Sequence, residues 1–257
     1  MELNYKSFGV GEPLIILHGL FGMLDNWQTF AKQLSSNYEV FIPDQRNHGR
    51  SPHSDEHSYK LMARDIYDFM VEQNLFSAHM MGHSMGGKTA MQFAAYYPGF
   101  VRKLIVIDIF PKQYNALPPE HRLMFSVIDK IIQKRFTKRI EAEELISSLL
   151  PDPRLSGFMS KNLLINDQGI VSWKFNAKAL KDNYNLLSEK IDITGKINNK
   201  TLLIKGGNSN YISNEDERNI DQYFSNARIK IFPNAGHWVN VDAPELLLET
   251  VTEFLGE

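Results

Sequence analysis

Six short apolar runs restrict the fold of this chain more than any other feature of its sequence. They cover residues 14–17, 40–42, 79–81, 104–107, 202–204 and 229–232, and most of them end at Gly, Pro, Asp or His. Continuous apolar runs of this length favour strands that are buried on both faces, as in parallel sheets. Helical patterns lie between the runs, for example over residues 85–97. The alternation predicts a doubly wound, mostly parallel α/β sheet.

Residues 111–190 interrupt this alternation, because they contain helical patterns without strong strands. Two apolar stripes lie within them. We predict that residues 1–110 and 191–257 form the core, and that residues 111–190 form an inserted helical lid over the carboxyl ends of the strands, where ligands bind in open α/β sheets. The alternative is that both stripes are only packing surfaces. The first stripe consists of Met124, Val127, Ile128, Ile131 and Ile132, and the second of Ala177, Leu180, Tyr184 and Leu187.

The candidate nucleophile is Ser84, in the segment Gly82-His83-Ser84-Met85-Gly86. This G-x-S-x-G pattern follows an apolar run and precedes a helix, which is the context that the motif requires. A sharp strand-to-helix turn projects the serine above the sheet and points the Met85 N–H to where a negative oxygen forms. The alternative is an ordinary glycine-rich turn.

A second glycine-containing turn, His18-Gly19-Leu20-Phe21-Gly22, follows the first apolar run. A main-chain N–H from this loop can complete an oxyanion hole with Met85. We predict Leu20 as the donor, with Phe21 as the second candidate, and we interpret His18 as a structural residue.

The candidate base is His237, in Gly236-His237-Trp238, because it is the only histidine after residue 121. In hydrolases whose serine lies in a G-x-S-x-G turn between a strand and a helix, the chain order is serine, acid, histidine. Three other histidines, His48, His53 and His57, have a spacing that suggests a metal site. We interpret them instead as parts of a solvated polar loop, since no clear carboxylate set accompanies them.

The acid is harder to assign. It commonly follows the penultimate strand, but there the sequence has Asn210, and an amide cannot stabilise an imidazolium as a carboxylate does. Asp108 follows the preceding apolar run and is therefore expected at the same edge of the sheet. We predict Asp108 as the acid, with Asp216 and Asp242 as alternatives.

Together these segments resemble the YbfF-type esterases of the α/β-hydrolase superfamily. Further shared segments are Arg46-Asn47-His48-Gly49, Ile107-Asp108-Ile109 and Trp173-Lys174-Phe175-Asn176. The resemblance implies a triad acid after the sixth strand, which fits Asp108. It also implies a four-helix lid and hydrolysis of short to medium acyl esters, with acyl-CoA thioesters as a further substrate class. Candidate substrate contacts are Trp173, Asn176 and Trp238, with packing as the alternative for Trp173.

Composition excludes several other classes of protein. The net charge is −2 and cysteine is absent, so there is no electrostatic footprint for nucleic acid and no thiolate nucleophile or thiolate metal site. We see no signal peptide and no apolar run long enough to enter a membrane as a spanning helix. We therefore expect a cytoplasmic enzyme, monomeric or a small homo-oligomer, that acts on a small molecule.

The predicted reaction is two-step acyl transfer through an acyl-enzyme, which requires no cofactor and no metal. Two groups of alternatives remain. The first is a different enzyme on the same residues, namely a cofactor-free perhydrolase or a carbon–carbon bond hydrolase. The second is a non-catalytic ligand receptor on the same scaffold.

Overall fold

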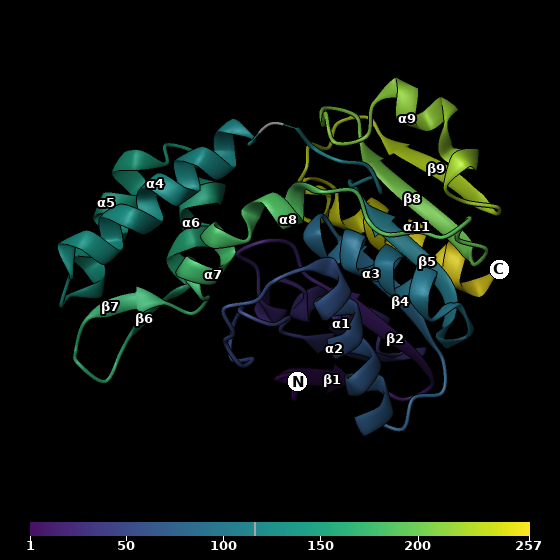
Figure 1. The fold of residues 1–257 in the computed structure, drawn as a ribbon, viewed down its shortest axis with the longest axis horizontal. Helices are drawn as coiled ribbons and strands as arrows, with labels where there is room; N and C mark the ends of the chain where they lie inside the picture. The colour runs from purple at the N-terminus through teal and green to yellow at the C-terminus, as the bar shows by residue number, and fades with distance from the viewer. Residues whose placement is uncertain (116) are drawn as a thin grey trace.

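The computed structural model describes residues 1–115 and 117–257, and within them a seven-stranded sheet forms the centre of the molecule (Figure 1). Its order is β1-β3-β2-β4-β5-β8-β9. The strands are β1 (Tyr5–Phe8), β2 (Glu12–Leu17), β3 (Tyr38–Pro43), β4 (Ala78–His83), β5 (Val101–Ile107), β8 (Lys200–Gly206) and β9 (Ala227–Phe232).

The six predicted apolar runs all lie in the parallel strands β2, β3, β4, β5, β8 and β9. The predicted fold class is therefore confirmed. The edge strand β1 was not predicted, and it pairs antiparallel with β3. Its residues are mostly exposed, so it carries no apolar run that could reveal it.

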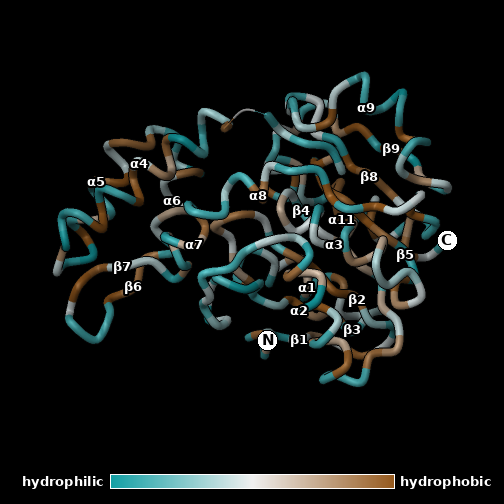
Figure 2. Tube along the Cα trace, viewed as in Figure 1, coloured by the Kyte–Doolittle hydropathy of each residue, from teal (hydrophilic) through white to brown (hydrophobic). Residues whose placement is uncertain are grey.

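Helices cover both faces of the sheet, because neighbouring side chains on a strand point to opposite faces. Ile15 and Leu17 pack with α2 (Tyr59–Glu72) and α3 (Met85–Tyr96), whereas Leu14 and Ile16 pack with α1 (Gln28–Leu34) and α11 (Pro244–Gly256). Figure 2 shows the resulting concentration of hydrophobic residues along the strands.

Shorter elements complete the core. They are the 3₁₀ turns η1 (Leu24–Asn26), η2 (Pro98–Phe100) and η3 (Ile220–Gln222) and the helices α9 (Asn214–Arg218) and α10 (Val239–Asp242). Among the described residues, no helix combines the length and apolar character that crossing a membrane demands.

The insertion, residues 111–190, lies to one side of the sheet in Figure 1 and contains a hairpin as well as helices. Four helices were expected, whereas residues 117–190 contain five, and the hairpin was not expected. It forms because Gly169, at φ 72°, closes a turn in which Asn166 N–H donates to the Ile170 carbonyl oxygen. The elements are α4 (Pro119–Lys134), α5 (Arg139–Leu149), α6 (Pro153–Lys161), β6 (Leu163–Ile165), β7 (Val171–Trp173), α7 (Ala177–Asp182) and α8 (Tyr184–Ser188).

The insertion has a hydrophobic cluster of its own. Met124 and Ile131 from the first predicted stripe and Leu180 from the second are buried in it. Ile132 is 51% exposed, so the first stripe is one residue narrower than predicted. Phe21, from the loop after β2, also belongs to this cluster. The insertion is thus attached to the core through one of the predicted oxyanion residues.

Candidate active site

The turn that carries Ser84 joins β4 to α3 and has a strained backbone. Ser84 has φ 53° and ψ −120°, and its N–H donates to the Ile107 carbonyl oxygen at 3.0 Å. A Cβ at Gly82 would lie 2.2 Å from the Gly86 carbonyl oxygen, and one at Gly86 would lie 2.3 Å from the Leu17 carbonyl oxygen. Only glycine therefore fits on either side of the serine, and the strained turn places the serine side chain above the sheet edge.

Three side chains from three different loops meet at this edge. His237 Nε2 lies 3.0 Å from Ser84 Oγ, and His237 Nδ1 lies 2.8 Å from Asp108 Oδ2. The loops follow β4, β5 and β9, so Asp108 follows the fifth strand of this chain and not the sixth. Because a carboxylate can only accept, Nδ1 carries the proton and Nε2 is left to accept from the serine hydroxyl. This arrangement allows His237 to remove the serine proton.

Asp108 is fully buried, and donors surround its carboxylate. Oδ1 accepts from Gly206 N–H at 2.9 Å, and Oδ2 accepts from Ser209 Oγ as well as from His237. These donors supply hydrogen-bond partners to both oxygens of the buried carboxylate. The position fits the acid proposed from the sequence.

The alternative acids are engaged elsewhere. Asp216 pairs with Lys112 and accepts from Ser213 N–H at 2.7 Å at the start of α9. Asp242 accepts from Gly236 N–H and from the Arg154 guanidinium, both at 2.8 Å. Neither is bonded to His237.

Three aromatic residues around His237 were not singled out from the sequence. Tyr211 stacks on its ring, with centroids 3.9 Å apart and an interplanar angle of 18°. His83 Nε2 donates to the His237 carbonyl oxygen at 2.8 Å. Burial lowers the pKa of His83 to about 3, and burial together with His237 lowers the pKa of His121 to about 4. The only sequence signal was adjacency: His83 precedes Ser84, and Tyr211 follows Asn210.

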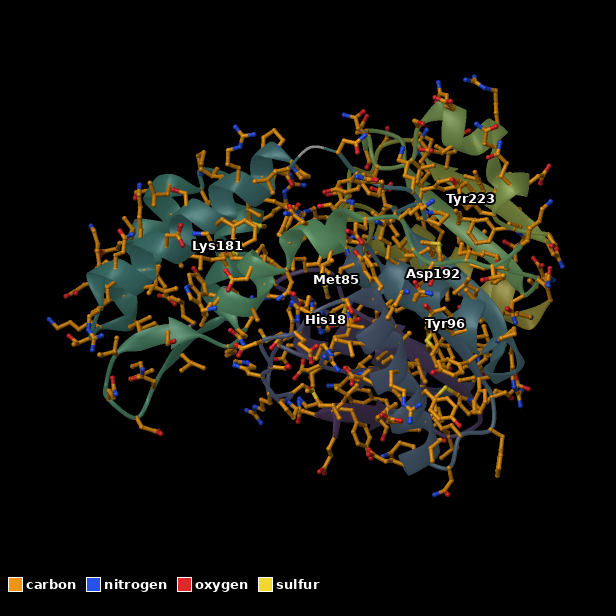
Figure 3. All side chains as sticks on the ribbon, viewed as in Figure 1. His18, Met85, Tyr96, Lys181, Asp192 and Tyr223 are labelled. Carbon is orange, nitrogen blue, oxygen red and sulfur yellow. The ribbon has the colours of Figure 1, made fainter. Side chains whose placement is uncertain are left out.

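Two main-chain N–H groups remain available for an oxyanion. Met85 is the first residue of α3, so its N–H has no acceptor within the helix. Leu20 N–H has no hydrogen-bond acceptor within residues 1–115 and 117–257, and Leu20 lies beside Ser84 in the lining of the same cavities. Figure 3 marks Met85 and the neighbouring His18 where the insertion meets the core.

Phe21 does not fit its predicted role as an oxyanion donor. Its N–H donates to His48 Nε2 at 3.1 Å, and its side chain packs against Phe125 and Phe175. Leu20 is therefore the candidate that remains.

The interpretation of His48 and His57 as solvated was wrong. Both are buried, whereas His53 is exposed. His48 Nδ1 donates to the Arg46 carbonyl oxygen at 2.9 Å, which leaves Nε2 to accept from Phe21. Burial lowers the pKa of both rings, that of His57 to about 3. His48 is therefore an uncharged imidazole that holds the loop of residues 18–22 through its hydrogen bond with Phe21 N–H.

Two cavities open at Ser84. The larger, about 430 Å³, includes Leu20, His121, His237 and Trp238 in its lining. The smaller, about 40 Å³, shares Leu20, Ser84 and His121 with the larger one. The predicted contact Trp238 thus lies in a cavity wall, where its ring meets Phe158 edge-on at 4.5 Å.

The structure contradicts the prediction that Trp173 and Asn176 line the pocket. Neither belongs to the lining of the two cavities. Trp173 is 4% exposed and stacks on Phe175 within the cluster of the insertion. Asn176 caps α7, and its N–H donates to the Asn47 carbonyl oxygen at 2.8 Å. Both residues hold the insertion together or attach it to the core.

Comparison with known proteins gives a consistent result. Residues 12–151 match the family model described as alpha/beta hydrolase fold. A putative esterase/lipase of Haemophilus influenzae is 36% identical over 99% of this chain and 88% of its own length, and esterase YbfF of Escherichia coli is 31% identical over the whole of both chains. The solved structure of a marine microorganism esterase superposes with a TM-score of 0.92 at 38% identity, covering 98% of this chain and 99% of that one.

Proposed function

This chain belongs to the α/β-hydrolase family, and its full-length relatives are named as esterases or lipases. We propose that it is a serine esterase in which Ser84, His237 and Asp108 form the catalytic triad. The observation that carries the proposal is the continuous chain of contacts from Asp108 through His237 to Ser84, at 2.8 and 3.0 Å. These distances suit general-base activation of a hydroxyl.

The first half of the reaction forms the acyl-enzyme. Ser84 Oγ attacks the ester carbonyl carbon while His237 Nε2 takes the serine proton. The N–H groups of Leu20 and Met85 stabilise the negative oxygen of the tetrahedral intermediate. When this intermediate collapses, the bond to the leaving group breaks and His237 gives its proton to the leaving oxygen or sulfur.

The second half releases the acid. His237 deprotonates a water molecule, the hydroxide attacks the acyl carbon, and Ser84 Oγ leaves with the proton from His237. In this proposal the insertion is the lid of the active site, because α4 and α6 supply Met124 and Phe158 to the wall of the larger cavity. We extend the proposal to acyl-CoA thioesters, since the same sequence of steps cleaves a thioester.

The test combines labelling with turnover. The purified protein should react with a fluorophosphonate probe and hydrolyse p-nitrophenyl esters and acyl-CoA thioesters of graded chain length. Ser84→Ala should abolish both reactions. Ser225→Ala, which alters an exposed serine bonded to Asn198, should leave both unchanged and serves as the control.

The alternatives give different results in the same experiment. A receptor takes no label and releases no product. A perhydrolase forms peracid from peroxide and acetate faster than it hydrolyses esters, and a carbon–carbon bond hydrolase leaves simple esters intact. Labelling at a residue other than Ser84 would refute the assignment of the nucleophile.

A further inference from the structure

The two cavities at Ser84 differ in which catalytic group they contain. His237 lines the larger cavity, and Met85 lines the smaller one. If the protein is the serine esterase proposed above, the leaving group must receive its proton from His237. It therefore departs on the side of the larger cavity. The acyl chain then lies on the opposite side of the carbonyl, in the smaller cavity beside Met85.

The smaller cavity limits the length of the acyl chain. Its volume is about 40 Å³, and a cavity must offer roughly 10–15 Å³ to hold one group of the size of a water molecule. The cavity therefore has room for about three such groups. This space suits a short acyl chain, whereas the larger cavity of about 430 Å³ accommodates a leaving group of considerable size.

The wall of the smaller cavity contains a buried amine, that of Lys88. This residue lies one helical turn after Ser84, and its N–H donates to the Ser84 carbonyl oxygen at 3.1 Å. Only 1% of Lys88 is exposed. Its Nζ lies 4.8 Å from the centre of the Tyr114 ring and 5.3 Å from that of Tyr59, and both tyrosines line the same cavity.

The Lys88 amine lacks a carboxylate partner in the part of the chain that the structure describes, where its acceptor is the main-chain oxygen of Glu189. A buried ammonium without a directly bonded anion is costly. The aromatic faces and the Coulombic attraction of the Glu189 carboxylate compensate only in part, and the Lys112 ammonium opposes them. Burial accordingly lowers the pKa of Lys88 to about 7. A carboxylate that entered the cavity would supply the missing counter-ion.

We propose that Lys88 selects acyl chains that end in a carboxylate, so that the preferred substrates are monoesters or monothioesters of short dicarboxylic acids. The ester carbonyl is held at Ser84 between the N–H groups of Leu20 and Met85. The distal carboxylate lies against the Lys88 ammonium between Tyr59 and Tyr114. Lys88 is therefore a specificity-determining residue of the smaller cavity.

The experiment compares two esters of equal chain length, monoethyl succinate and ethyl butyrate, which differ in a terminal carboxylate against a methyl group. Hydrolysis is followed at constant pH by titration. The parent protein should show at least about 10-fold higher kcat/KM for monoethyl succinate, because a charge-assisted bond to a buried partner is worth about 1.5–3 kcal/mol. Ethyl levulinate, which carries a neutral acceptor at the same distance, should be hydrolysed with an intermediate kcat/KM.

Two variants separate substrate recognition from a structural role. Lys88→Met should reduce the ratio of the two kcat/KM values at least about 10-fold. Gln92→Leu is the matched control: Gln92 lies one turn further along α3 and bonds the backbone of Asp192 at 2.7 and 2.8 Å, in the same segment that Lys88 contacts at Glu189. It should leave the ratio unchanged.

Each outcome bears on a defined claim. An unchanged ratio in Lys88→Met, or an equal fall in Gln92→Leu, overturns the role of Lys88. If Lys88→Met does not fold, the test depends on the kcat/KM values of the parent protein. A preference of the parent protein for ethyl butyrate over monoethyl succinate then overturns the proposal. A parent protein that takes the fluorophosphonate label and hydrolyses ethyl butyrate keeps the proposed function in that case, whereas one that does neither overturns both.

Discussion

Replacing Asp108 with asparagine tests the proposed triad most directly, because the structure fixes how the new amide must lie. The Asp108 Oδ1 position receives Gly206 N–H at 2.9 Å. The amide oxygen must occupy this position, since an NH₂ group there would leave a buried donor without an acceptor, at a cost of roughly 1–3 kcal/mol. The amide nitrogen then faces His237 Nδ1, 2.8 Å from the Oδ2 position.

This orientation reverses the tautomer of His237. The amide nitrogen donates to Nδ1, so the imidazole must carry its proton on Nε2, the atom 3.0 Å from Ser84 Oγ. An Nε2 that already bears a proton cannot take the serine proton. In a serine protease triad the same substitution lowers kcat about 10⁴-fold, which corresponds to about 5 kcal/mol of transition-state stabilisation. We expect a loss of this order in Asp108→Asn.

The assay is kcat on a p-nitrophenyl ester, together with the rate of fluorophosphonate labelling and the thermal unfolding midpoint. Asp216→Asn and Asp242→Asn are the controls. Both carboxylates are bonded away from His237, so kcat should stay within a few-fold of the parent value. A folded Asp108→Asn protein that keeps more than about a tenth of the parent kcat would refute the reasoning, as would a large loss in either control.

Three further predictions concern the residue that supports the loop of Leu20, the pH dependence of the free energy of unfolding, and the larger cavity. His48→Phe removes the acceptor of Phe21 N–H and should lower kcat about 10-fold or more with little change in KM, whereas His48→Gln, whose amide oxygen can accept, should recover most of the loss; equal activity of the two variants argues against the role of His48. Burial lowers the pKa of His57 and His83 to about 3 and that of His121 to about 4, below the ordinary value of about 6.5. Between pH 6 and 4 these three rings alone let the unfolded chain bind close to three more protons than the folded one, and buried His48 acts in the same direction. The free energy of unfolding in urea should therefore fall by about 4 kcal/mol for each unit by which the pH is lowered from 6 to 4; a constant value over that range contradicts this. Trp238→Ala should raise KM several-fold for esters with large leaving groups but not for ethyl esters, because Trp238 lines the larger cavity; an equal effect on both would place Trp238 outside leaving-group binding.

Local signals account for what could be predicted correctly about the fold. A strand buried on both faces is continuously apolar, so the inner parallel strands were visible as runs. The edge strand β9 is mostly exposed and is interrupted by Lys230, so its pattern was weaker. The exposed strand β1 needs no such pattern and was missed. Ser84 could be located because glycine is required at Gly82 and Gly86, where no Cβ fits.

The errors concern residues whose role depends on what packs against them. Phe21 and Leu20 are neighbours in one loop, and only the position of His48 shows which N–H is already bonded. Trp173 looks like a substrate contact until Phe175 is seen stacked on it. His48 and His57 lie in a polar segment, yet tertiary packing buries both of them.

The sequence by itself determined the six parallel strands of the core and the identity of the candidate nucleophile and base, because each depends on a hydrophobic run or on a short motif. Only the tertiary structure brought Asp108, Ser84 and His237 within hydrogen-bond distance and enclosed Lys88 beside them. Residues distant in the chain meet only when parallel strands bring their carboxyl ends to one edge of the sheet. The burial that alters the charge state of a side chain likewise arises only after packing.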